Sequence, residues 1–150
     1  MTSSQKWDHR FLELARYISS WSKDTTKIGA VIADNDKSHD VVSMGYNGFP
    51  RGFFDGGERL KDRIEKYKYT VHGEMNAIYA AAREGKSLSD NSLYVYGLPV
   101  CQECAKGIIQ VGIKRVVVNT MDAPQHWMVS CMKAAEFFKE AGVEYRTINL

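Results

Sequence analysis

The sequence predicts an α/β fold in which a mixed β-sheet carries helices on both faces. Three observations lead to this prediction: a hairpin pattern follows an initial helical pattern, strand and helix patterns alternate after it, and the last pattern is again a strand. A chain of 150 residues is long enough to bury a substantial core. We therefore expect residues 1–150 to form one domain.

The N-terminal part predicts one helix and one hairpin. Apolar residues recur every three or four positions over 6–21, which predicts a helix with a single buried stripe. The stripe consists of Trp7, Phe11, Leu14, Ile18 and Trp21. β-Branched residues in IGAVIAD (28–34) predict a buried strand. The turn sequence DNDKSHD follows, so we expect VVSMGY (41–46) to return as the partner strand.

Residues 47–70 form the longest stretch without a clear periodic pattern. The stretch begins with the glycine-rich sequence NGFPRGFFDGG and continues with the charged sequence ERLKDRIEKYKY. Loops of this length inside a domain are usually functional. We expect the charged part to form an exposed helix or a lid, and Tyr67 and Tyr69 are candidates to line a pocket.

Helix and strand patterns alternate through the second half of the chain. The predicted helices are 73–84, 102–111 and 126–141, each followed by a glycine that ends it. The predicted strands are 92–98, 114–120 and 143–148. Cys131 lies on the apolar stripe of the last helix, so we predict that it belongs to the core.

Charge and cysteine content argue against several classes of protein. The 20 basic and 18 acidic residues give a net charge of +2, which is too balanced for a nucleic-acid coat or a membrane-surface protein. No apolar run approaches the roughly 20 residues of a membrane span, and MTSSQKWDHR lacks the plan of a signal peptide, so we expect a cytoplasmic protein. Two of the three cysteines form a C-x-x-C motif, which favours metal or redox chemistry over structural disulfides.

One group of residues has the spacing of a metal site. His72 and Glu74 stand two positions apart at a predicted helix start, so they can share a site only above the helix end. Cys101 and Cys104 are three apart at another helix start, so both thiols can point the same way. His72 and the two cysteines would supply three ligands, which with a water make a catalytic zinc site. Glu74 is then placed to move protons.

Two other interpretations of these residues remain open. A C-x-x-C motif also serves thiol redox chemistry, although that role leaves His72 and Glu74 unexplained. A closed structural zinc site needs a fourth ligand, which His9, His39 or His126 would have to supply. The catalytic zinc site is the interpretation that gives every residue of the group a role.

The motifs resemble those of the deoxycytidylate (dCMP) deaminases within the cytidine deaminase superfamily. Zinc deaminases share the pattern H-x-E followed by P-C-x-x-C. Three segments are similar to the dCMP deaminases: GYNGFPRG (45–52), HGEMNAI (72–78) and CQECAKGIIQVGIK (101–114). The segments occur in the family's order, and the resemblance covers about residues 7–147.

The resemblance implies a three-layer α/β/α sandwich with a five-stranded mixed sheet. It also implies deamination of dCMP to dUMP and ammonia, with zinc-bound hydroxide attacking C4 of the cytosine ring. His72, Cys101 and Cys104 would hold the zinc ion, and Glu74 would shuttle protons. We expect one zinc per chain, because residues 48–70 contain no Cys or His for a second, structural site.

The resemblance also points to substrate-binding residues. Asn47 corresponds to the residue that would bond the sugar 3′-hydroxyl, and Tyr46 and Gly73 belong to the same two motifs. Lys27 and Arg51 are candidates for the cations that bind the 5′-phosphate. Family members are commonly oligomers and several respond to dCTP and dTTP, so the resemblance implies a homo-oligomer and such regulators.

Two departures from the family pattern leave the substrate open. Gly73 replaces the alanine that usually follows the metal-binding histidine, and Val100 separates Pro99 from Cys101. We expect this inserted residue to reshape the pocket floor. The alternative is a related zinc deaminase acting on a nucleoside, a modified pyrimidine nucleotide or a purine base. The balanced charge argues against a nucleic-acid-editing enzyme, and the intact site residues argue against an inactive binding subunit.

Overall fold

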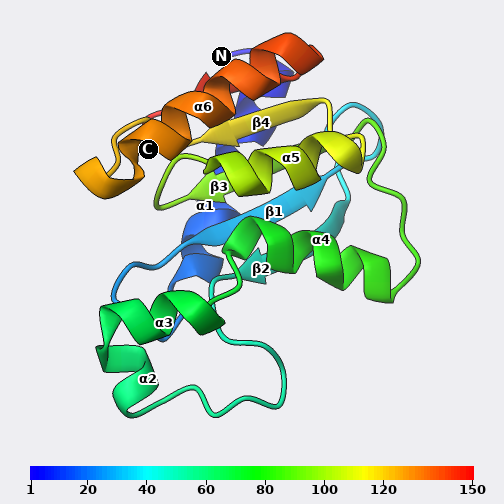
Figure 1. Cartoon of the computed structure of the whole chain (residues 1–150). Coiled ribbons are helices and arrows are strands. Elements are labelled where there is room, and N and C mark those ends of the chain that lie inside the picture. The colour runs from blue at the N-terminus through cyan, green and yellow to red at the C-terminus, as the bar shows by residue number, and fades with distance from the viewer.

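A five-stranded mixed sheet forms the centre of the molecule in the computed structural model, which describes residues 1–150 (Figure 1). The strands are β1 (Gly29–Ala33), β2 (Val41–Tyr46), β3 (Ser92–Tyr96), β4 (Arg115–Val118) and β5 (Glu144–Thr147). Their order in the sheet is β2-β1-β3-β4-β5. β1 runs antiparallel to both of its neighbours, whereas β3, β4 and β5 are parallel. The predicted hairpin and the predicted mixed sheet are therefore confirmed.

Helices cover both faces of this sheet, as predicted. The helices are α1 (Ser3–Ser19), α2 (Glu58–Lys61), α3 (Arg63–Tyr69), α4 (Gly73–Arg83), α5 (Gln102–Gln110) and α6 (Gln125–Ala141). α1 lies on one face, and α4, α5 and α6 lie on the other (Figure 1). Side chains alternate along β1, so that Val31 and Ala33 pack with α1 while Ala30 and Ile32 join the core on the other side. No helix of the structure combines the length and the apolar character that a membrane span requires.

α1 begins and ends earlier than its apolar stripe predicts. A capping box starts it, because Thr2 Oγ1 accepts from Gln5 N (3.1 Å) and Gln5 Oε1 accepts from Thr2 N (2.8 Å). The helix ends at Ser19, so Trp21 lies beyond it and is 51% exposed. The prediction that Trp21 is core is therefore wrong, whereas Trp7 packs half-buried against the α1 core.

Gly45, in the GYNG sequence, allows α4 to lie directly against β2. A Cβ atom at this position would lie 2.4 Å from the backbone nitrogen of Ala77 in α4. α4 has His72 as its N-cap and Glu74 in its first turn. The close contact at Gly45 therefore helps to fix the position, relative to β2, of the helix end that carries these two residues.

A buried polar network ties α1 to the sheet at the end opposite the cysteine motif. Asp8 is fully buried, and its carboxylate accepts from Asn35 Nδ2 (2.8 Å) and the Tyr94 hydroxyl (2.7 Å). It also pairs with Arg115 and, at 3.3 Å, with Arg146. Arg115 begins β4 beside the first residue of β3, whereas Cys101 follows the last residue of β3. The network therefore belongs to the scaffold and lies outside the site.

Replacing Asp8 by asparagine should lower the free energy of unfolding by about 2–4 kcal/mol, because two arginines lose a buried anion. Urea denaturation at pH 7 measures this change. Glu13→Gln is the matched control, since Glu13 makes only an exposed pair with Arg16 at 3.7 Å, and it should cost less than about 0.5 kcal/mol. Equal losses in the two variants would contradict a stabilising role for the network.

Candidate active site

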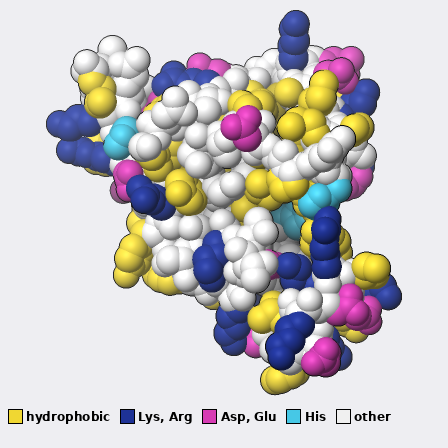
Figure 2. Space-filling model, turned by 90° about the vertical axis from the view of Figure 1, so that its left-hand side faces the viewer, with side chains coloured by type: hydrophobic (Ala, Val, Ile, Leu, Met, Phe, Trp, Pro, Cys, Tyr) yellow, Lys and Arg dark blue, Asp and Glu magenta, His cyan; other side chains and the backbone are white.

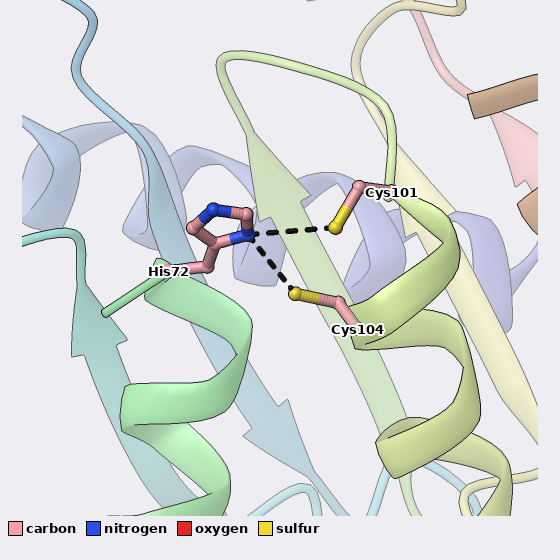
Figure 3. A group of neighbouring side chains, drawn as sticks. All are labelled: His72, Cys101 and Cys104. Atoms are coloured by element: carbon pink, nitrogen blue, oxygen red, sulfur yellow. Dashed lines mark hydrogen bonds between the residues drawn. The ribbon is translucent and has the colours of Figure 1, made fainter. Parts of the chain in front are cut away.

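The three predicted metal ligands lie together at the beginnings of two helices. His72 is the N-cap residue of α4, Cys101 is the N-cap residue of α5, and Cys104 lies in the first turn of α5 (Figure 3). The Nδ1 atom of His72 is 3.3 Å from the Cys104 sulfur and 3.4 Å from the Cys101 sulfur. All three ligand atoms fall within 4.8 Å of one another.

These distances fit a tetrahedral zinc ion. With Zn–S near 2.3 Å and Zn–N near 2.0–2.1 Å, tetrahedral geometry places nitrogen and sulfur about 3.5 Å apart. The group of possible ligands contains only these three residues, so neither His9, His39 nor His126 completes a closed site. Three protein ligands leave a fourth position for water or substrate, which is the plan of a catalytic site.

The surroundings of the cysteines favour a thiolate beside the imidazole. A hydrogen bond from the Cys104 thiol, reinforced by the nearby His72, holds the pKa of Cys101 well below its ordinary value. The pKa of His72 is raised in turn, because its ring bonds to Cys101. The N-terminus of α5 adds to this effect, since its unpaired N–H groups favour negative charge on sulfur.

Glu74 lies beside these residues in a buried position. It is the second residue of α4 and is 4% exposed. Burial raises the pKa of its carboxyl group to about 7, far above the value in water. Glu74 and His72 line the same pocket, as the two-residue spacing requires if both serve one site. A carboxyl group with this pKa can both accept and donate a proton near neutral pH.

The pocket above the metal group joins residues from most parts of the chain. Its lining residues are Asp24, Thr26, Ile28, Asn47, Lys66, Tyr67, Thr70, His72, Glu74, Leu98, Pro99, Cys101, Trp127 and Cys131. Trp127, which the sequence placed on the apolar stripe of its helix, meets the His72 ring edge-on at 5.9 Å. Tyr67 lines the pocket and Tyr69 does not. Cys131 is buried, as predicted, and its side chain also faces the pocket.

The predicted substrate-binding residues are only partly brought together. Asn47 lines the pocket, and its carboxamide accepts from Ile28 N (2.9 Å) and donates to Thr26 O (2.7 Å). It retains one N–H and one lone pair for a ligand. Gly73 is not among the lining residues of the pocket, and a Cβ atom there would come within 3.2 Å of the backbone oxygen of Ile28.

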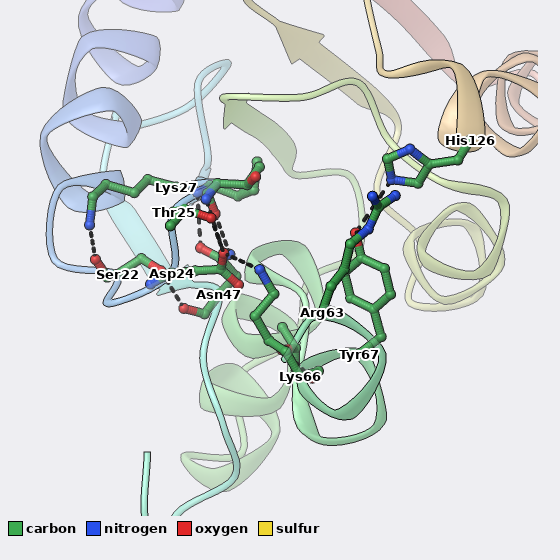
Figure 4. A network of polar contacts seen from close by, with 12 residues as sticks. Ser22, Asp24, Thr25, Lys27, Asn47, Arg63, Lys66, Tyr67 and His126 are labelled. Atoms are coloured by element: carbon green, nitrogen blue, oxygen red, sulfur yellow. Dashed lines mark hydrogen bonds and ion pairs between the residues drawn. The ribbon is translucent and has the colours of Figure 1, made fainter. Parts of the chain in front are cut away.

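Three other candidates lie outside the pocket lining. The ammonium group of Lys27 turns to the backbone oxygen of Ser22 (Figure 4), and Arg51 is exposed in a turn. Tyr46 is 40% exposed and packs edge-on against Trp21. The structure therefore provides no contact between these three side chains and the metal group.

A buried ion pair in the pocket wall was not predicted. Lys66 in α3 and Asp24 are both almost fully buried, and Lys66 Nζ lies 2.9 Å from Asp24 Oδ1 (Figure 4). Lys66 is the only lysine or arginine that lines the pocket. Nothing in the sequence distinguishes it from the four other basic residues of ERLKDRIEKYKY, because the fold alone turns this one residue inward.

The inserted Val100 does not form the pocket floor. Its side chain is fully buried in the core on the sheet face that α4, α5 and α6 cover, while Leu98 and Pro99 line the pocket. Its backbone N–H donates to the hydroxyl of Tyr145 at 3.0 Å. The side chain of Val100 is therefore not a lining residue, and the expectation that the insertion reshapes the pocket floor stays a prediction.

A three-layer α/β/α fold with a His-Cys-Cys group beside a buried glutamate defines the class of zinc-dependent deaminases. Residues 5–120 match the family described as "Cytidine and deoxycytidylate deaminase zinc-binding region". The chain is 38% identical over 148 residues to an uncharacterized deaminase in the luxG 3′ region of Aliivibrio fischeri, covering 97% of this chain and 95% of that one. It is 33% identical over 147 residues to deoxycytidylate deaminase of Homo sapiens, covering 94% and 79%.

A solved structure shows the same architecture. The dCMP deaminase of cyanophage S-TIM5, crystallised in complex with dCMP and dUMP, superposes with a TM-score of 0.77, 22% identity and 99% coverage of both chains. The chain belongs to the cytidine and deoxycytidylate deaminase family. The family resemblance of the motifs and the predicted fold are thus confirmed.

Proposed function

We propose that this protein catalyses the hydrolytic deamination of dCMP to dUMP and ammonia. The observation that carries this proposal is the His72, Cys101 and Cys104 group beside the buried Glu74 in one pocket. The likeness to deoxycytidylate deaminase of Homo sapiens supports the choice of substrate. Figure 2 adds that Lys and Arg side chains are scattered among acidic ones on the visible face, with no continuous basic stripe for a nucleic acid.

His72, Cys101 and Cys104 would hold one zinc ion per chain. When bound, zinc lowers the pKa of a coordinated water towards neutrality and so makes hydroxide available. Glu74 takes one proton of the attacking water on its carboxylate and gives it to the ring nitrogen N3. It then takes the second proton of that same oxygen and gives it to the departing amino group, which leaves as ammonia. Burial suits Glu74 to this role, because it raises the pKa of the carboxyl group above its ordinary value in the protein without metal. Trp127 and Leu98 exclude bulk water around the reacting carbon.

Lys66 is the cation that we assign to the 5′-phosphate, in place of Lys27 and Arg51. It lines the pocket, and Asp24 holds its ammonium group in position before a ligand enters. An ammonium group at a largely buried position binds a phosphate more strongly than a solvated one does. Asn47 retains its proposed role at the sugar, since one N–H and one lone pair of its carboxamide remain free.

Comparing substrates tests both the reaction and the phosphate contact. The zinc-loaded protein should convert dCMP faster than CMP, deoxycytidine or 5-methyl-dCMP, measured by ultraviolet absorbance. Lys66→Gln should lower kcat/KM for dCMP by about 10–100-fold, because a charge-assisted hydrogen bond is lost. The rate with deoxycytidine should change less than about threefold, which also shows that the variant is folded.

The controls are Lys27→Gln and Arg51→Gln, whose side chains lie outside the pocket lining. Each should change kcat/KM for dCMP by less than about threefold. Equal losses for dCMP and deoxycytidine in Lys66→Gln would overturn the phosphate assignment. Turnover of another compound in the panel, with no turnover of dCMP, would show that dCMP is not the substrate. Adding dCTP and dTTP to the same assay tests the predicted regulation, and the sedimentation of the protein tests the predicted homo-oligomer.

A further inference from the structure

Both helices that carry the metal ligands begin at a ligand, which leaves them without ordinary caps. An N-cap side chain usually accepts a hydrogen bond from a free N–H group in the first turn. Neither His72 in α4 nor Cys101 in α5 makes such a bond. The first-turn N–H groups beside these two ligands are therefore open to acceptors from other elements.

Two side chains from the C-terminal part of the chain provide these acceptors around Cys101. Ser130 in α6 accepts from the backbone N–H of Gln102 at 2.9 Å. The Tyr145 hydroxyl in β5 accepts from the backbone N–H of Val100 at 3.0 Å. The residues directly before and after Cys101 therefore each donate their backbone N–H to a side-chain oxygen from a different element.

We propose that Ser130 and Tyr145 are positioning residues of the metal site. They hold the backbone on both sides of Cys101, so that its sulfur stays at bonding distance from the ion that His72 and Cys104 share. Partners that orient metal ligands typically change metal affinity by about 10–100-fold. The inference rests on the metal site of the proposed function, and it is independent of the substrate.

Ser130 lies in α6 and Tyr145 in β5, both outside residues 5–120 that match the family's zinc-binding region. Val100 is the residue inserted before Cys101, and its N–H is the one that Tyr145 binds. The hydrogen bond thus anchors the backbone of the inserted residue, and the side chain of Val100 fills the core below it.

Zinc affinity of the purified protein, measured by competition with a chelator, tests the proposal. Ser130→Ala and Tyr145→Phe should each weaken zinc binding by about tenfold or more. Ser130→Thr keeps the acceptor oxygen and should restore affinity to within about threefold of the unchanged protein. Cobalt substituted for zinc gives a second readout, because sulfur-to-cobalt absorption bands should shift in Ser130→Ala and return in Ser130→Thr.

Two variants in β3, both in the buried network around Asp8 and Arg115, serve as matched controls. Ser92→Ala removes a buried serine oxygen that accepts from Arg115, and Tyr94→Phe removes a buried hydroxyl that donates to Asp8. Both should bind zinc within about threefold of the unchanged protein, although they lower the stability of the metal-free fold. Should Ser130→Ala fail to fold, Tyr145→Phe and Ser130→Thr still decide the matter.

Two results would overturn the proposal. One is unchanged zinc affinity in folded Ser130→Ala and Tyr145→Phe. The other is an equal loss of affinity in Ser92→Ala and Tyr94→Phe, which would show that zinc binding merely follows the stability of the fold. Because no nucleotide is present in these measurements, a failure here is distinguishable from a failure to deaminate dCMP.

Discussion

Glu74→Gln is expected to lower kcat for dCMP deamination by about 10²–10⁴-fold, the range typical of losing a general acid–base group. Glu74 is 4% exposed and lines the pocket beside His72. A glutamine has the same shape and cannot carry the proton. Zinc affinity should stay within about threefold of that of the unchanged protein, because Glu74 is not among the ligands. The free energy of unfolding should not fall, because glutamine has no charge to bury. Steady-state kinetics and a zinc assay measure these effects.

Glu103→Gln is the matched control for this experiment. Glu103 lies between the two cysteine ligands in sequence, yet its side chain is exposed and pairs with Lys106 at 2.9 Å. Its replacement should change kcat by less than about threefold. If Glu74→Gln retained more than about a tenth of the normal rate, Glu74 would not be the proton shuttle.

Cys104→Ser should lower zinc affinity by at least about 100-fold and so abolish deamination. Removing a ligand weakens metal binding more than removing a residue that only orients a ligand, which typically costs about 10–100-fold. Cys104 is 1% exposed, and its sulfur lies 3.3 Å from His72 Nδ1. Serine is a poor zinc ligand, since its hydroxyl remains protonated near neutral pH. Metal content after dialysis, together with chelator competition, measures the change.

Cys131→Ala separates this effect from the loss of any buried thiol. Cys131 is buried and lines the same pocket, but it does not belong to the group of ligand atoms. This variant should keep one zinc per chain at nearly normal affinity. The assignment of ligands fails if zinc is lost from Cys131→Ala as completely as from Cys104→Ser.

The metal group could be predicted from the sequence because its spacing is local. His72 and Glu74 begin one helix, and Cys101 and Cys104 begin another, so short-range geometry already limits where their side chains point. The sheet could be predicted for a similar reason, since β-branched runs and turn residues mark its strands. Only the fold shows that the N-termini of α4 and α5 lie next to each other.

The substrate-binding side chains could not be predicted in the same way. Lys27 and Arg51 lie in irregular segments, where tertiary contacts rather than periodicity decide the direction of a side chain. Lys66 lies in a charged helix that the sequence presents as solvent-exposed, and the fold buries it against Asp24. The core position of Val100 likewise depends on packing in a cluster whose other members are mostly distant in sequence.

The most direct test of the account is zinc titration of metal-free protein with dCMP as substrate. We predict no dUMP before zinc is added, a linear rise in its rate of formation, and a plateau at one zinc per chain. Formation of dUMP by the metal-free protein would contradict the account, and so would the absence of dUMP from protein that holds one zinc at His72, Cys101 and Cys104.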